Sequence, residues 1–91
     1  MFQFEWDYQK AERNMQKHGV SFDEAVSVFS DPMALTFLDS DHSETEDRSR
    51  TYDLSSKGRL IIVVHTERHK NLRIISARKA TRNEKNIYAQ G

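Results

Sequence analysis

The sequence has 91 residues, with 14 Lys and Arg against 14 Asp and Glu, no cysteine and no formal net charge. This length predicts one small domain over residues 1–91, and the lack of cysteine excludes disulfides and thiolate metal sites. No apolar run approaches the roughly 20 residues that a membrane helix needs. The first ten residues do not resemble a signal peptide, so we expect a cytoplasmic protein without membrane contact.

The N-terminal part predicts a short strand followed by a helix. Residues 2–6 alternate aromatic and polar side chains, which is typical of a strand. Asp7 can cap a helix over 8–18, and Gly19 suits the left-handed position that ends it. The helical spacing predicts these core-facing side chains: Tyr8, Ala11, Met15 and His18.

A second helix begins at a capping box. Ser21 is the expected N-cap and Glu24 the third helical residue, and the helix is expected to run to about Phe29. The Asp-Pro pair at 31–32 stops it, and residues 33–38 predict a strand. An acidic loop at 39–46 separates this strand from a less regular one at 48–54.

The most apolar stretches predict two central strands at 60–64 and 72–77. The charged residues 67–71 between them predict the turn of a hairpin. A capping box formed by Thr81 and Glu84 begins a last helix through about Ala89. Sequential strands with short turns predict an α+β fold, in which two N-terminal helices and one C-terminal helix pack on a small antiparallel sheet.

Positive charge gathers around these central strands. Nine of the 14 Lys and Arg residues lie from Lys57 onward, where only Glu67 and Glu84 are acidic. Strict alternation puts Arg73 on one face of its strand and Arg78 on the other. Rigid strands that carry guanidinium groups are typical of a polyanion site, although a solvated, salt-bridged surface has the same charge pattern.

Two blocks of motifs resemble the BrnT toxin family over nearly the whole chain. The N-terminal block contains F-E-W-D at 4–7, K-H-G-V-S-F at 17–22 and D-P at 31–32. The C-terminal block contains V-H-T-E-R at 64–68 and R-I-I-S-A-R-K-A-T at 73–81. The sequence departs from the family at Ser49, where an aromatic residue is common, and near Asp53, where a glycine is common.

The resemblance implies the toxin of a type II toxin–antitoxin pair with a RelE-like ribonuclease fold. RNA cleavage would arrest translation and growth. The implied partner is a BrnA-type antitoxin with a ribbon-helix-helix part, in a complex of two toxins and two antitoxins. Operator DNA would be bound only through that antitoxin.

The sequence offers candidates for metal-independent cleavage of RNA. Arginines can hold the phosphate and stabilise its extra negative charge, and we expect Arg78 first, then Arg73 and Arg48, in this role. His65 is the candidate acid or base, and Glu67 is a further candidate base. The competing interpretations are salt bridges for the arginines, a packed core histidine, and a solvated glutamate.

Further cations are candidates for RNA binding, and no metal or cofactor is expected. These residues are Lys10, Lys17, His18, Arg68, Lys79 and Arg82. Trp6 and Tyr88 would either stack on bases or close the core. The main alternative function is a non-catalytic module of the same fold that binds RNA or the antitoxin, since fold alone does not fix chemistry. Direct DNA binding is a weaker alternative, because no helix is basic along one face.

Overall fold

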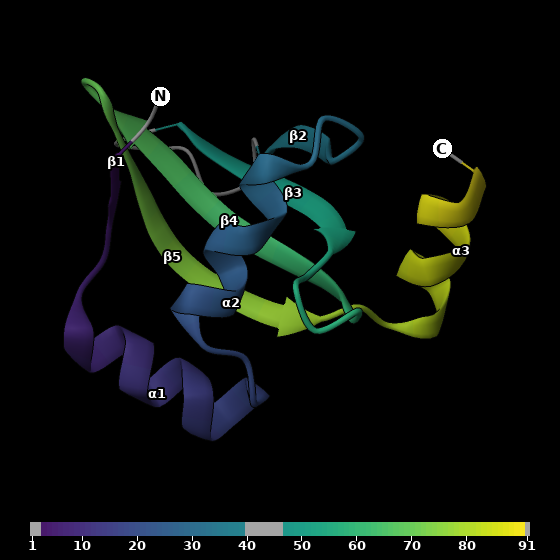
Figure 1. The fold of residues 1–91 in the computed structure, drawn as a ribbon, viewed down its shortest axis with the longest axis horizontal. Coiled ribbons are helices and arrows are strands. Elements are labelled where there is room, and N and C mark those ends of the chain that lie inside the picture. The colour runs from purple at the N-terminus through teal and green to yellow at the C-terminus, as the bar shows by residue number, and fades with distance from the viewer. Residues whose placement is uncertain (1–2, 40–46, 91) are drawn as a thin grey trace.

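The computed structural model describes residues 3–39 and 47–90 (Figure 1). The elements are β1 Gln3–Glu5, α1 Tyr8–His18, α2 Phe22–Val26, the 3₁₀ helix η1 Ser27–Ser30, β2 Leu35–Asp39, β3 Arg48–Leu54, β4 Leu60–Arg68, β5 Asn71–Lys79 and α3 Arg82–Gln90. The predicted acidic loop lies outside the described residues, apart from Asp39. Within the described residues, no helix is long and apolar enough to cross a membrane.

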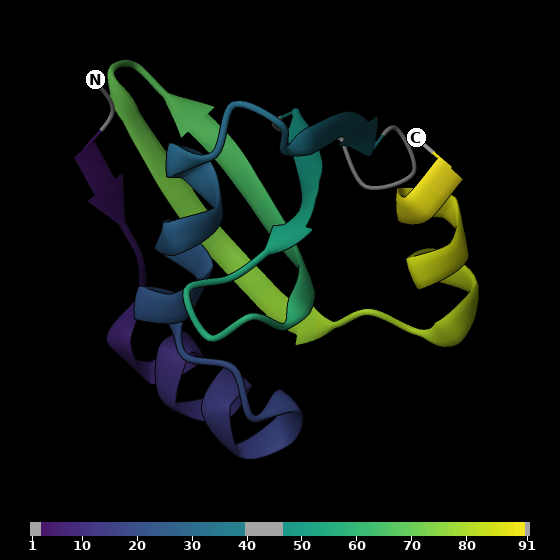
Figure 2. The same cartoon turned by 45° about the vertical axis from the view of Figure 1, so that its right-hand side comes forward.

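The five strands form one mixed sheet in the order β1-β5-β4-β3-β2. The strands from β2 to β5 are antiparallel neighbours, but β1 pairs with β5 in parallel. The expectation of an antiparallel sheet was therefore wrong at this edge, while the α+β class is confirmed. β1 and β5 are not joined by a short turn, because both helices and the strands β2 to β4 lie between them in the chain (Figures 1 and 2). The expectation of antiparallel pairing for strands joined by short turns therefore does not apply to this pair.

The central hairpin of β4 and β5 is longer than predicted. Its strands pair as far as Arg68 and Asn71, so only His69 and Lys70 remain at the turn. His69 adopts a positive φ of 57°, as a tight hairpin turn requires. Glu67 therefore lies in β4, opposite Leu72, and its placement in the turn was wrong. The ends of the two strands at the tip of the hairpin remain in water, so they can contain charged residues such as Glu67 and Arg68.

The core lies between one face of the sheet and the segment that contains α2 and η1. Its buried residues are Val20, Phe22, Ala25 and Val28 on one side and Ile61, Val63, Leu72, Ile74 and Ala77 on the sheet. Trp6 closes this core with its ring edge against Phe22, at 5.9 Å between centroids. We call this side of the sheet the covered face.

Helix α1 lies beside β5 and buries only a narrow strip. Tyr8 is 83% exposed and Met15 is 48% exposed, so their predicted core positions were wrong. The buried position is instead taken by Asn14, which the sequence places on the polar side of the helix together with Lys10 and Lys17. Hydrogen bonding explains why a polar residue is preferred there.

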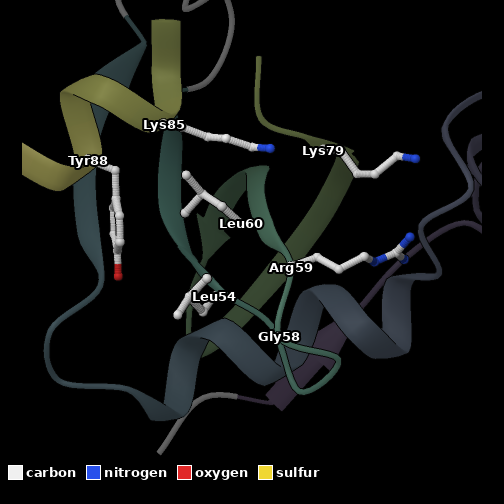
Figure 3. A pocket seen from close by; sticks show the side chains of 7 residues that line it. All are labelled: Leu54, Gly58, Arg59, Leu60, Lys79, Lys85 and Tyr88. Atoms are coloured by element: carbon white, nitrogen blue, oxygen red, sulfur yellow. The ribbon is translucent and has the colours of Figure 1, made fainter. Parts of the chain in front are cut away.

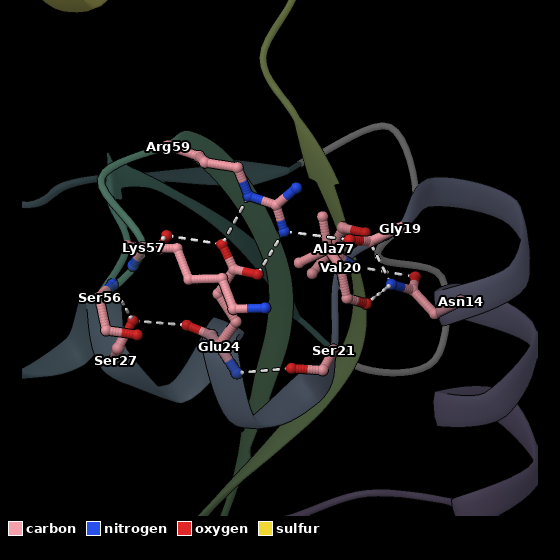
Figure 4. A network of polar contacts seen from close by, with 11 residues as sticks. Asn14, Gly19, Val20, Ser21, Glu24, Ser27, Ser56, Lys57, Arg59 and Ala77 are labelled. Carbon is pink, nitrogen blue, oxygen red and sulfur yellow. Dashed lines mark hydrogen bonds and ion pairs between the residues drawn. The ribbon is translucent and has the colours of Figure 1, made fainter.

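The side chain of Asn14 continues the sheet beyond the end of β1 (Figure 4). Pairing of β1 with β5 ends at Arg73, which leaves the following part of the β5 edge without a strand. There the Asn14 Nδ2 donates to the carbonyl of Ala77 at 2.8 Å, and the Ala77 N–H donates to Asn14 Oδ1 at 3.1 Å. Nδ2 also donates to the carbonyl of Val20 at 2.8 Å. One amide thus fixes α1 to the sheet and satisfies buried backbone groups.

A second polar cluster joins α2 to the turn between β3 and β4 (Figure 4). The buried carboxylate of Glu24 accepts from Arg59 Nε at 3.0 Å and from Ser55 Oγ at 2.6 Å, and forms an ion pair with the same arginine. The hydrogen bond from Arg59 lowers the pKa of Glu24. Ser21 caps the helix as expected, because its Oγ accepts from the N–H of Glu24 at 3.0 Å.

Candidate functional site

The face of the sheet opposite the core carries the predicted arginines of β5. The register of β4 and β5 shifts between Val64 and His65, and Ile75 is the extra residue in β5. This bulge interrupts the alternation, so that Ile74 and Ala77 both enter the core. Arg73 and Arg78 consequently share the opposite face, which we call the open face. Strict alternation had placed these two arginines on different faces.

Strand β3 supplies two further arginines to the open face. Thr51 and Asp53 are on the covered side of β3, so Arg48, Arg50 and Tyr52 alternate onto the open face. Arg48 lies opposite Thr66 of β4, and Thr66 lies in turn opposite Arg73 of β5. The two arginines of β3 make no ion pair with any residue that the structure describes, and their buried Nε atoms have no hydrogen-bond partner there.

Aromatic and apolar side chains lie among these arginines. Tyr52 and Ile62 are buried, and Phe37 of β2 is directly opposite Arg50. Phe37 packs edge-on against Tyr52, with 5.7 Å between ring centroids and an interplanar angle of 89°. Phe37 is nevertheless 48% exposed, so its ring remains available for stacking with a base.

Arg78 is held by a bidentate ion pair. Its Nη1 and Nη2 donate to the two carboxylate oxygens of Glu84 at 2.7 and 2.8 Å. Glu84 also completes the predicted capping box of α3, since its carboxylate accepts from the N–H of Thr81 at 2.9 Å. Chiefly through the hydrogen bonds from Arg78, the pKa of Glu84 falls to about 2. The guanidinium is fixed in orientation, but part of its positive charge is compensated.

His65 lies on the covered face, away from the arginines. Its side chain is buried, its ring packs edge-on against Phe29 at 4.8 Å, and its Nε2 is 2.7 Å from the hydroxyl of Thr51. Burial lowers the pKa of His65 to about 4, so the imidazole is neutral at physiological pH. This environment corresponds to the packed histidine that the sequence left as the alternative.

A shallow cleft of about 200 Å³ separates α1 from the β5 bulge and is partly lined by basic residues. The lining residues are Lys10, Arg13, Asn14, Lys17, His18, Ile75 and Ser76. Burial, with the positive charges of Lys17 and Arg78, lowers the pKa of His18. Arg78 of the open face is thus close enough to this cleft to act electrostatically on His18.

The other predicted residues are spread over the molecule. Glu67 is exposed and alternates onto the same side of β4 as His65, so it does not share the face of the arginines. Arg68 is exposed at the end of β4, and Arg82 is the exposed first residue of α3. Lys79 lies beside a groove under α3, and Tyr88 bonds there to Asp53. Neither Lys79 nor Tyr88 belongs to the open face.

Arg50, Phe37 and Glu84 are parts of this site that were not predicted from the sequence. The signal for Arg50 was present, since it alternates with Arg48 and Tyr52 once residues 48–54 are accepted as a strand. The partnership of Glu84 with Arg78 follows from its capping position, which turns its carboxylate back toward the end of β5.

Comparisons with known proteins identify the family. Curated protein sequences include no significant match. A solved structure, the crystal structure of the Brucella abortus ribonuclease toxin BrnT, is similar with a TM-score of 0.69 at 22% identity, over 90% of this chain and all of that one. The profile of the family described as "Ribonuclease toxin, BrnT, of type II toxin-antitoxin system" matches residues 6–84. The chain therefore belongs to the BrnT ribonuclease toxin family of type II toxin–antitoxin systems.

Proposed function

We propose that this chain is a single-domain, metal-independent endoribonuclease of RelE-like type, whose RNA cleavage arrests translation and growth. The observation that carries the proposal is the convergence of Arg48, Arg50, Arg73 and Arg78 on the open face of one rigid sheet. Guanidinium groups match phosphate oxygens, and two of these arginines have no ion-pair partner among the described residues. Family membership supports the choice of RNA as the polyanion.

In this proposal, charge stabilisation provides most of the catalysis. The 2′-hydroxyl gives up its proton and attacks the adjacent phosphorus, while the bond from phosphorus to the 5′-oxygen of the next nucleotide breaks. That oxygen leaves with a proton, and the product is a 2′,3′-cyclic phosphate. The arginines stabilise the charge that develops on the phosphate oxygens. Removing one such donor costs roughly 10²–10³-fold in rate in well-studied enzymes. His65 and Glu67 do not share the arginines' face, so the mechanism does not rest on either as the base. Phe37 is suited to hold an adjacent base by stacking.

A toxin of this type requires an antitoxin. We infer a BrnA-type partner with a ribbon-helix-helix part, and a complex of two toxins and two antitoxins that binds operator DNA through the antitoxin alone. The chain has no net charge, and its cations are concentrated on the open face and the adjoining cleft. That distribution favours a local polyanion site over general attraction to duplex DNA.

The test is cleavage of a defined RNA by the purified chain, alone and with ribosomes, in excess EDTA. We expect Arg50→Ala and Arg78→Ala to lower the cleavage rate by about 10²-fold or more. Lys57→Ala removes an exposed cation from the turn before β4 and should cleave at the wild-type rate. Equal rates for all four proteins would assign the cleavage to a contaminant or to another site.

A non-catalytic binding module is the second candidate. The specific observation in its favour is the burial of His65, whose neutral ring packs against Phe29 instead of facing the arginines. This candidate predicts RNA binding that weakens in Arg50→Ala, together with no cleavage by the folded wild-type chain. Cleavage that is lost in the arginine variants eliminates it.

A further inference from the structure

A groove lies between α3 and the adjoining ends of β3, β4 and β5, beyond the arginines of the open face (Figure 3). Its volume is about 520 Å³. The lining residues are Leu54, Gly58, Arg59, Leu60, Lys79, Lys85 and Tyr88. Leu54 and Leu60 provide an aliphatic floor, and Lys85 extends over Leu60 from the helix (Figure 3). The groove is thus apolar below and positively charged at its rim.

The groove exists because α3 stands away from the sheet. None of the residues of α3 is buried, although an amphipathic helix ordinarily packs its apolar side against a core. The helix is attached by polar contacts at two points, which are the Glu84–Arg78 ion pair and a 2.8 Å hydrogen bond from the Tyr88 hydroxyl to Asp53. Leu54 consequently remains 52% exposed and Ile87 49% exposed, as expected for apolar surface that a partner covers.

The charges at the rim define the chemistry of that partner. Lys79 and Lys85 make no ion pair with any residue in the described ranges 3–39 and 47–90, whereas Arg59 is already bound to Glu24. Two free ammonium groups above an aliphatic floor complement a peptide that has apolar side chains on one side and carboxylates beside them.

RNA fits this groove less well than such a peptide. Leu54 and Leu60 offer no stacking surface, and the one aromatic lining residue, Tyr88, is tied through its hydroxyl to the fully buried Asp53. The arginines that suit RNA are on the open face.

We propose that the groove is a docking site for an acidic, amphipathic segment of the antitoxin, which rests on the function proposed above. The apolar side of the segment covers Leu54 and Leu60, and its carboxylates face Lys79 and Lys85. A segment seated there also contacts α3, the helix that carries Glu84. Docking therefore holds Glu84 on Arg78 and couples antitoxin binding to the charge of the open face.

The experiment measures the affinity of the toxin for the antitoxin encoded beside its gene, with that purified antitoxin as the probe. Lys85→Glu and Leu54→Gln change exposed groove residues that are not among the four proposed catalytic arginines. We expect each to weaken binding by about tenfold or more. Lys70→Glu makes the same charge change at the far hairpin tip and should bind like the wild type. Circular dichroism establishes that every variant is folded.

Cleavage of RNA by the same proteins, without antitoxin, separates this inference from the proposed function. Weakened antitoxin binding with unchanged cleavage supports both. Weakened binding in a chain that never cleaves RNA supports the groove and removes the enzyme. Wild-type affinity in both groove variants, no antitoxin binding by the wild type, or a loss of RNA binding alone overturns the groove proposal.

Discussion

The two faces of the sheet treat polar groups in opposite ways. At the edge of the covered face, Asn14 bonds to the backbone of Ala77, and on that face Glu24 is bonded to Arg59 and Ser55. On the open face, Arg48 and Arg50 have no ion-pair partner among the described residues. Both faces belong to the same strands, so the difference arises from what lies against each face: other parts of the chain on one side and solvent on the other.

We therefore expect polar residues of the covered side to contribute mainly to stability and arginines of the open face to contribute mainly to ligand binding. Asn14 and Glu24 are bonded to other parts of the protein, so removing either side chain leaves partners unsatisfied at a cost in folding free energy. Arg48 and Arg50 on the open face have no ion-pair partner among the described residues, so their removal should affect ligand binding far more than folding. The following experiments would sharpen or contradict that distinction, in order of decreasing effect.

Glu24→Gln should have the largest effect. It removes the buried negative charge that pairs with Arg59 and accepts the hydrogen bond of Ser55, so the guanidinium of Arg59 loses its ion-pair partner. We expect the free energy of unfolding to fall by about 3 kcal/mol, measured by urea denaturation. Asp23→Asn changes an exposed neighbour on the same helix and should lie within about 0.5 kcal/mol of the wild type. Equal stability of both variants would contradict the comparison.

Asn14→Ala should have the second-largest effect on stability, because the free edge of β5 would lose its only side-chain partner in the described part of the chain. The N–H and carbonyl of Ala77 and the carbonyl of Val20 would remain buried without their bonds. We expect a loss of about 2–3 kcal/mol in the free energy of unfolding. Gln16→Ala, at an exposed position of α1, is the matched control and should change little.

The burial of His65 predicts a pH dependence. Its pKa is about 4 in the folded chain and near 6.5 when unfolded, so the unfolded chain binds a proton first as the pH falls. The stability contributed by the neutral ring is complete above pH 6.5 and is lost between 6.5 and 4. Between pH 7 and 5 we expect a loss of about 2 kcal/mol from this group.

Denaturation of His65→Gln over the same pH range isolates this contribution from other titrating groups. The variant should show a correspondingly smaller loss between pH 7 and 5. His69→Asn, at the exposed hairpin tip, should retain the wild-type pH profile, since Asn tolerates the positive φ there. A wild-type profile in His65→Gln would mean that the buried ring is not what titrates.

Glu84→Gln should have the smallest effect on stability and a measurable one on binding. The pair with Arg78 is partly exposed, so its loss should cost less than about 1 kcal/mol. The freed guanidinium should strengthen RNA binding by about two- to fivefold at low salt, measured by fluorescence anisotropy. Glu12→Gln removes an exposed negative charge from α1 and controls for net charge. Weaker binding in Glu84→Gln would show that Glu84 positions Arg78 for RNA.

Much of the fold could be predicted from local patterns, whereas the arrangement of the site could not. Capping residues such as Asp7 and Gly19 mark α1, and the apolar run at 60–64 marks the central strand. The bulge at Ile75 leaves no such local pattern, because it arises from the pairing of β5 with β4. Without it, Arg73 and Arg78 were assigned to different faces.

The burial of Asn14 was equally hidden from the sequence, because helical periodicity places it on the polar side of α1 with Lys10 and Lys17. A packed position for His65 was one of the interpretations that the sequence left open. Their positions depend on partners distant in the chain, namely Ala77 for Asn14 and Thr51 with Phe29 for His65. The sequence indicated that arginines would bind the phosphate. It did not show which polar residues face the solvent, because tertiary contacts decide that.

The amide of Asn14 also bears on self-association. An uncovered strand edge can recruit a strand from another molecule, which is a common route to aggregation. Where β1 ends, α1 places this amide against Ala77 and occupies the hydrogen-bonding groups that an incoming strand would need. A residue in a helix thereby closes the edge against strand addition. Asn14 variants that remain folded should accordingly be more prone to aggregate than their stability alone predicts.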